Sequence, residues 1–537
     1  MSVVTTDCRD YSSDDSACGR CGEVQLVDLR NVGKLACMSM DTPKHHTTLY
    51  ASSRLWQGNN SRLKRRIPPG THHAPGPAGL PVLGNAHQLR RQPHQQITAW
   101  AREYGQLYKI RLGWNDWYMI CSPEACKEIL DKQSVHSSSR APQPVAGDTL
   151  SGGMRFLFMP YGPEWRNLGG IGHKLLTLNV SATFKPSQEY EAKLLLEEML
   201  HGANDEVGND VSYMAIRRYT VSVMMTSTYG RRIPHLMNDF SVVATRGAYL
   251  ADALPFFGKA PTSSAVAKLW MPFFMSPETQ METKQAPDCF VKQFIESNYE
   301  KQGITELQAA FLAGSMIEAG SETTPSALNT AVLYLSANPD VQRVAQAQID
   351  ELVGCGRSPT FDDEEALPCI RAIVKETLRM RPVTSIGTPH YTTASIIYKD
   401  IYISANSVVA PEQYPIHYNL EIFPEPQRFN PDCFLNHRLG SGHYAGGPAS
   451  ARDYWALRMF IVLAKLLWAF DIVPSADETG NSLPVDHDGG KGLAKARWRA
   501  RTEESRQTIL KEVADARRDG YVLKGVKVGE GGMEVEV

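Results

Sequence analysis

The sequence has no run of about 18 or more apolar residues, the length that a membrane-spanning helix requires. The best candidate, residues 459–473, is shorter and contains Lys465 and Asp471, so it predicts a buried core helix instead. The N-terminus also lacks the positively charged and then apolar pattern of a secretory signal. We therefore expect neither a transmembrane anchor nor secretion.

The sequence has neither a large excess of one charge nor a cysteine pattern typical of disulfide-rich proteins. The 56 Lys and Arg residues nearly balance 58 Asp and Glu residues, and the net charge of -2 argues against a nucleic-acid partner. Ten cysteines in 537 residues do not make a disulfide framework, which indicates a reducing compartment. Cys18 and Cys21 form one C-x-x-C motif, but no second pair completes a zinc site. Free thiols are the alternative interpretation, and we expect no bound metal there.

By composition the chain divides into three parts. Residues 1–66 form a polar leader that we expect to be disordered. The leader ends in a basic cluster at residues 62–66, and the Pro- and Gly-rich segment that follows is typical of a stiff linker. The hydrophobic content of 42% supports a large core, which we place in residues 67–490. Residues 491–537 predict a charged helix over 502–518 and then a Gly-rich tail that we expect to be mobile.

Helical patterns dominate the central part of the chain. Residues 93–104 predict a helix that begins at a proline, which the first helical turn tolerates. Residues 107–112 and 117–121 alternate aromatic and β-branched residues and predict strands. Residues 150–350 are predominantly helical in pattern, and residues 383–412 contain short strand-like segments. The predicted fold class is therefore mainly α with a smaller β region.

The helix predicted over residues 312–335 has the interior sequence A-G-S-E-T-T-P, which begins at Ala319. In a helix interior, Gly and Pro cost about 1 and 3 kcal/mol relative to Ala. Pro325 has no N–H group, so it predicts a local kink or bulge. Gly320 would make room for a ligand, and Glu322 beside Thr323 could relay protons to it. The alternative is a kinked core helix without a chemical role.

A second motif lies on the helix that ends before Pro382. Glu376 and Arg379 are three residues apart on one helical face and can form an ion pair. Such pairs are usually exposed to solvent. Downstream, the Pro-rich loop 423–432 contains Arg428. We expect Arg428 to complete an Arg–Glu–Arg cluster that fixes this loop to the helix.

The order of these segments is a Pro-rich lead-in, an A-G-x-E-T-T helix, an E-x-x-R helix and a P-x-R-F loop. This order resembles the cytochrome P450 family, specifically its eukaryotic membrane-associated type from secondary metabolism, over about residues 75–474. Each motif is weak alone, but together they are specific. The resemblance implies the cytochrome P450 fold, incomplete at the haem-ligand loop. It also implies haem-dependent monooxygenation of a hydrophobic small molecule.

The resemblance implies roles for individual residues of the central helix. Glu322 and Thr323 match the family's proton-delivery pair, which lies beside bound oxygen. Ala319 and Gly320 match the segment that lies close to haem and substrate. These four residues are the expected catalytic and distal cofactor-binding positions.

Other matched residues would hold haem or support its binding core. Trp165 and His390 match positions that hydrogen-bond haem propionates. A structural triad, which supports the core rather than the reaction, is matched by Glu376, Arg379 and Arg428.

The Gly-rich, Cys-bearing loop of the family is missing before the helix that we expect to begin near Arg458, because residues 448–460 pass directly from a polar loop into that helix. A thiolate ligand favours O–O bond cleavage, so without it we expect impaired activity. Cys433 is nearest in sequence, but no Gly-rich turn surrounds it. A coding block omitted or lost between residues 455 and 459 would explain the gap. The alternatives are a non-catalytic, haem-free remnant and a faulty gene model.

Two further departures concern haem and membrane binding. Gly169 lies four residues after Trp165, where the family has an arginine. The polar leader stands where the family has its membrane anchor. The resemblance implies the cytosolic face of the endoplasmic reticulum, but without the anchor we expect a cytoplasmic location or assign none. The resemblance implies haem, an NADPH-dependent flavoprotein reductase as electron donor, and a lipophilic substrate. The apolar segments 137–158 and 240–257 agree with such a substrate but do not name it.

Overall fold

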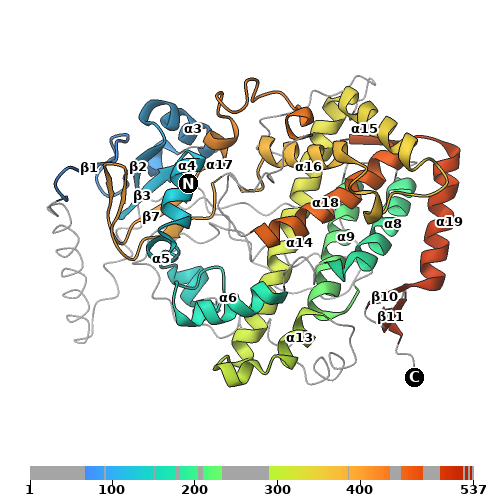
Figure 1. Cartoon of the computed structure of the whole chain (residues 1–537), viewed down its shortest axis with the longest axis horizontal. Helices are drawn as coiled ribbons and strands as arrows, with labels where there is room; N and C mark the ends of the chain where they lie inside the picture. Colours follow the sequence, from blue (N-terminus) through green and yellow to red (C-terminus); the bar gives the residue numbers. More distant parts are fainter. Residues whose placement is uncertain are drawn as a thin grey trace, which may run out of the picture. The chain divides into compact units, whose positions relative to one another are not determined.

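The 32-residue helix α14 (Glu306–Ala337) is the longest helix described in this computed structural model (Figure 1). Thr305 caps its first turn together with Gln308, and the helix ends before Asn338-Pro339 because a residue that precedes proline avoids the helical region. The structure describes residues 67–89, 92–149, 151–175, 182–202, 210–232, 289–384, 386–435, 449–475, 496–523, 526–529 and 532–534.

Nine further helices of seven or more residues lie in the described part of the chain. They are α3 (Pro93–Tyr104), α6 (Pro163–Leu175), α8 (Lys185–Gly202), α9 (Asp210–Tyr229), α13 (Phe290–Glu296), α15 (Pro339–Leu352), α16 (Pro368–Met380), α18 (Ala449–Ala469) and α19 (Glu503–Asp519). Short helical turns are α4 (Pro123–Cys126), α5 (Ser134–Ser137) and α17 (Gln413–His417). The helix α14 packs mainly against α9, and a large apolar core joins α8, α9, α14, α16 and α18.

A four-stranded sheet forms the larger of the β-rich parts, in the order β2-β3-β7-β4. The strands β2 (Leu107–Leu112) and β3 (Asn115–Ile120) pair antiparallel, and β3 pairs parallel with β7 (Val408–Pro411). The short strand β4 (His390–Tyr391) pairs antiparallel with β7. The predicted strands therefore exist, although β3 begins and ends earlier than the sequence indicated.

Three smaller sheets complete the β structure. Their strands are β1 (His72–His73), β6 (Ile401–Ile403) and β5 (Ile396–Tyr398) in the first, β8 (Phe470–Pro474) and β9 (Ala496–Ala500) in the second, and β10 (Tyr521–Leu523), β11 (Val526–Gly529) and β12 (Gly532–Glu534) in the third. Helix therefore predominates over strand, and the prediction of a mainly α fold with a smaller β region is confirmed.

The C-terminal part differs from the prediction. The expected charged helix is α19, but β10, β11 and β12 form an antiparallel sheet where the sequence predicted a mobile tail. Both α19 and β10 pack against α8, and residues from Pro69 to Val537 belong to one compact unit. The predicted polar leader and its C-x-x-C motif lie outside the described residues.

The apolar segment 459–473 is also divided differently. The helix α18 begins at Ala449, earlier than the expected start near Arg458, and gives way to the strand β8 at Phe470. Residues 436–448 and the side chains of residues 449–457 lie outside the described part. Among the described residues, no helix combines the length and the apolar character that crossing a membrane requires.

Candidate active site and its supporting network

The middle of α14 remains one continuous helix through Pro325. Hydroxyl groups bond carbonyls one turn earlier on both sides of the motif: Thr323 Oγ1 donates to Ala319 O at 2.6 Å, and Ser326 Oγ donates to Glu322 O at 2.7 Å. Such bonds are common for hydroxyl residues inside helices. Ala319 is exposed although half of the residues of this helix are buried, and Thr323 lies one turn further along the same face. We call the pair Ala319 and Thr323 the open face of α14.

The space beside Gly320 is not open. A Cβ atom at this position would lie 2.2 Å from Sδ of Met224, a residue of the neighbouring helix α9. The Met224 sulfur also accepts a hydrogen bond from the buried Arg458 guanidinium of α18. The Met224 side chain thus fills the space beside Gly320, and glycine allows the two helices to approach closely here; the cofactor-binding role expected of Gly320 stays a prediction.

Each of two glutamates on α14 is held by an arginine from another element. Arg217 Nη2 of α9 lies 2.6 Å from Oε1 of Glu322, and Arg155 Nε donates to Oε2 of Glu318 at 3.0 Å. Glu318 and Glu322 are four residues apart and so share a helical face next to the open face. Glu322 is thus fixed beside Thr323, as proton delivery would require. Neither arginine was predicted from the sequence; the signal for Arg217 was the adjacent pair Arg217-Arg218 in a helix whose only other charged residue is Asp210.

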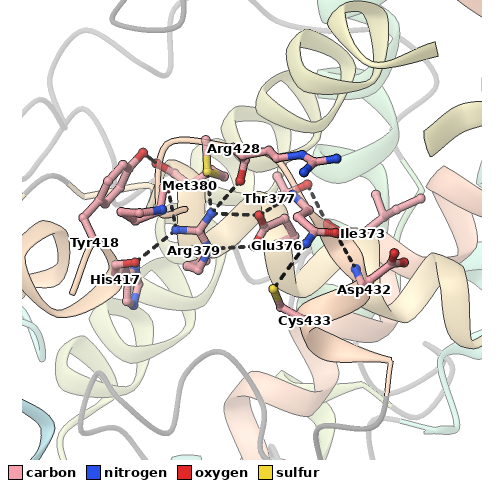
Figure 2. A network of polar contacts seen from close by, with 12 residues as sticks. Ile373, Glu376, Thr377, Arg379, Met380, His417, Tyr418, Arg428, Asp432 and Cys433 are labelled. Atoms are coloured by element: carbon pink, nitrogen blue, oxygen red, sulfur yellow. Dashed lines mark hydrogen bonds and ion pairs between the residues drawn. The ribbon is translucent and has the colours of Figure 1, made fainter. Parts of the chain in front are cut away.

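The ion pair between Glu376 and Arg379 of α16 is fully formed and buried (Figure 2). Arg379 donates from Nε to Oε2 at 2.6 Å and from Nη2 to Oε1 at 2.8 Å, a bidentate arrangement. Its Nη1 also donates to the carbonyls of His417 and Pro426, and the backbone N–H of Asn430 donates to Glu376 at 2.7 Å. Burial raises the pKa of Glu376, and the bonds from Arg379 and Asn430 oppose that rise.

The third member predicted for this cluster, Arg428, does not join it. Figure 2 shows the Arg428 guanidinium pointing away from Glu376, and its Nη1 pairs with exposed Glu425 at 3.2 Å. Only the Arg428 carbonyl takes part, accepting from Arg379 Nη2 at 3.2 Å. The loop is therefore fixed to α16 by its backbone. The Arg428 side chain remains in solvent, where its charge needs no partner to offset desolvation.

The other predicted haem contacts lie on α6 and on β4. The Trp165 ring stacks on Phe156 at 5.4 Å, and a Cβ at Gly169 would lie 3.3 Å from Cζ of Phe156. The aromatic ring of Phe156 thus fills the space beside Gly169, where the family has an arginine. Nδ1 of His390 lies 3.1 Å from the Ser137 carbonyl, and burial, with the charge of Arg140, lowers the pKa of His390 to about 4. His390 is therefore neutral near pH 7 and can donate only one hydrogen bond.

Five of the six cysteines in the described part of the chain have raised pKa values. A thiolate ligand is favoured by nearby positive charge and a lowered pKa. Burial raises the pKa of Cys433, and the charge of Glu376 raises it further. The pKa values of Cys121, Cys126 and Cys369 are also raised by burial, and that of Cys355 is raised by a hydrogen bond to Glu504. Among the described residues, His, Cys, Asp and Glu side chains also form no metal-binding group of three or more.

Comparisons with known proteins agree with the site. The family described as Cytochrome P450 matches residues 74–446. The chain is 37% identical over 497 residues to Cytochrome P450 monooxygenase pgmC of Aspergillus terreus (strain NIH 2624 / FGSC A1156), covering 86% of this chain and 92% of that protein. It is 32% identical over 478 residues to Cytochrome P450 monooxygenase verL of Clonostachys rogersoniana, covering 81% and 86%.

A relative from a third organism covers a similar share. Cytochrome P450 monooxygenase 69 of Postia placenta (strain ATCC 44394 / Madison 698-R) is 31% identical over 503 residues, covering 81% of this chain and 87% of that protein. Family membership implies haem and a reductase that supplies electrons. On the buried Glu376–Arg379 pair, the A-G-S-E-T-T segment of α14 and these matches, the chain belongs to the cytochrome P450 family.

Proposed function

We propose that this chain descends from, and retains the scaffold of, a monooxygenase that oxidises a hydrophobic small molecule in secondary metabolism. The open face of α14 and the adjoining Glu322 carry the proposal, because they place a hydroxyl next to a carboxylate on this helix. Arg217 fixes the Glu322 carboxylate, and Thr323 lies one residue further along the helix. The three named relatives are all monooxygenases by name, which supports the reaction class.

The roles of individual residues follow from this geometry. Glu322 and Thr323 would move protons at their carboxylate and hydroxyl oxygens, and Arg217 would keep the carboxylate in place. Glu376 and Arg379 would hold the loop from Pro426 to Asn430 against α16 without touching substrate. Trp165, His390 and Ala319 would line the cofactor side of the site. An NADPH-dependent flavoprotein reductase would supply electrons, as it does for the family.

A specific observation favours a second function, that of a haem-free and non-catalytic relative. Five described cysteines, Cys433 and Cys355 among them, have raised pKa values, whereas a thiolate ligand of iron is favoured by a lowered one. Such a protein would keep the fold, because the Glu376–Arg379 pair and the core around α14 do not depend on haem. In that form it would bind a ligand or a partner, or have no function.

Two measurements separate these functions. The first is sequencing of the mature transcript across the codons for Asp453 to Phe460; a Gly-rich, Cys-containing insertion would restore the monooxygenase function. The second is a spectrum of the reduced, carbon-monoxide-treated protein expressed with haem supply. A thiolate-type Soret band supports the enzyme, whereas a folded sample without that band leaves the haem-free relative. The Thr323→Ala variant is the control, because it should leave haem binding intact.

A further inference from the structure

The C-terminal helix α19 lies against α8 and has a narrow apolar contact with the core (Figure 1). More than half of its residues are charged, and its buried apolar side chains are Ile509, Val513 and Ala516. These three side chains belong to the large core that also includes α8 and α18. Local stability follows the number of buried apolar contacts, so a helix with this little apolar burial is expected to open before the whole protein unfolds.

Polar side chains complete the attachment of α19 around a buried amine. Lys465 of α18 is 1% exposed, and its Nζ donates to Ser358 Oγ at 2.5 Å. Glu512 of α19 accepts from Ser358 twice, from the backbone N–H at 2.8 Å and from Oγ at 2.6 Å. Thr508 Oγ1, one turn earlier on α19, donates to the Cys355 carbonyl at 2.9 Å. The helix α19 is therefore bonded to the loop that holds the Lys465 amine.

A pair of adjacent arginines on α19 makes two different kinds of contact. Arg517 donates from Nη1 and Nη2 to the two carboxylate oxygens of Glu197 on α8, at 2.8 Å and 2.6 Å. Arg518 pairs instead with Asp515 and Asp519, which belong to α19 itself. Only the Arg517 ion pair therefore joins α19 to another element, whereas the Arg518 pairs would persist if α19 moved away as a helix.

We propose that α19 is a detachable clasp, which opens as a unit, uncovers the Lys465–Ser358 pair and leaves the core around α14 folded. Its attachment consists of a short apolar stripe and side-chain hydrogen bonds, which local opening can break without disturbing α14 or α16. Opening needs neither haem nor catalysis, so its test is independent of the proposed monooxygenase function.

Opening of the clasp should also take up a proton. Burial lowers the pKa of Lys465 to about 8, whereas an ordinary lysine has a value of 10.5. The charged groups that act on this amine are Glu512 of α19, Lys193 and Glu189 of α8, and Asp363. Between the two pKa values the open form binds more protons than the closed form, so opening becomes less favourable as pH rises.

Competitive acetylation of the full chain, read by mass spectrometry, tests the proposal. Acetic anhydride at trace concentration reacts with accessible neutral amines, so exposed Lys511 of α19 reports the reagent and buried Lys465 reports opening. In Arg517→Ala, labelling of Lys465 relative to Lys511 should rise about two- to fivefold, as expected for the loss of a partly exposed ion pair. Arg518→Ala is the matched control and should leave this ratio unchanged. In the parent, the ratio should fall about tenfold from pH 8 to pH 9.5.

Alkylation of the buried Cys289 thiol by iodoacetamide measures opening of the core and should stay at the parent level in both variants. Four results would each overturn the proposal: no labelling of Lys465 in the folded protein, an unchanged ratio in Arg517→Ala, an equal rise in Arg518→Ala, or a ratio that does not fall with pH. A rise at Lys465 that Cys289 matches would also overturn it, because the whole protein would then be opening rather than α19 alone.

Discussion

Gly320 and Met224 meet where α14 crosses α9, and a Cβ on Gly320 would lie 2.2 Å from the Met224 sulfur. The Gly320→Ala variant should therefore lower the free energy of unfolding by about 1–3 kcal/mol through overpacking. This loss should occur although Ala favours a helix over Gly by about 1 kcal/mol. Urea denaturation followed by circular dichroism measures the change.

The same substitution in a Met224→Ala background provides the control. With the three nearest atoms removed, all of which belong to the Met224 side chain, Gly320→Ala should stabilise the protein by up to about 1 kcal/mol. Equal effects in both backgrounds would show that Met224 is not the neighbour that requires glycine.

The buried pair Glu376–Arg379 and the exposed pair Glu425–Arg428 should respond very differently to mutation. Arg379→Met leaves a buried carboxylate without its partner and should cost about 3–5 kcal/mol of unfolding free energy. Arg428→Ala should change it by less than about 0.5 kcal/mol, because its guanidinium is in solvent. Chemical denaturation of both variants is the measurement. A loss in Arg428→Ala as large as that in Arg379→Met would reinstate the predicted Arg–Glu–Arg cluster.

Glu412, which follows β7, should make stability fall as pH rises. Its side chain is fully buried, neither carboxyl oxygen has a hydrogen-bond partner, and burial raises its pKa well above the ordinary value near 4.5. The folded state therefore keeps a proton that the unfolded state releases above pH 4.5, so this group's contribution decreases with rising pH. Glu412→Gln cannot ionise, and its stability advantage over the parent should grow from pH 4.5 to pH 8.

Urea titrations of both proteins across this pH range measure the difference. Glu421→Gln, an exposed neutralisation in the same region, serves as the control and should change stability by less than about 0.5 kcal/mol. A constant difference between parent and Glu412→Gln at all pH values would contradict the assignment of a buried, protonated carboxyl.

Lys465 of α18 should make the stability of the protein rise with pH in the alkaline range. Its Nζ donates to Ser358 Oγ at 2.5 Å, and Ser358 in turn donates to Glu512 of α19. Burial lowers the pKa of Lys465 to about 8, against 10.5 for an ordinary lysine. Between these values the unfolded state binds more protons than the folded state, so this group's contribution to stability increases with pH. The parent should gain up to about 3 kcal/mol relative to Lys465→Met from pH 8 to 10.5. Parallel curves of unfolding free energy against pH for the two proteins would refute this.

Local sequence patterns determined the family, the fold class and most elements of this protein. The helix from Pro93 to Tyr104 was predicted with its observed ends, because a proline at its start and Gly105 after its end act locally. The Glu376–Arg379 pair could also be predicted, because three residues within one helix fix the geometry of an ion pair. Hydrophobic periodicity and capping are short-range effects, so they can be read without knowing the neighbours.

Only the tertiary structure decided which space each side chain fills. The sequence suggested open space beside Gly320. The side chain of Met224, almost a hundred residues earlier in the chain, occupies that space. The sequence placed Arg428 in the correct loop but not its side chain. The Arg428 carbonyl accepts a hydrogen bond from Arg379, and the Arg428 guanidinium lies in solvent. Contacts between distant segments depend on how whole helices and strands pack against one another. The local sequence around a single residue does not specify that packing.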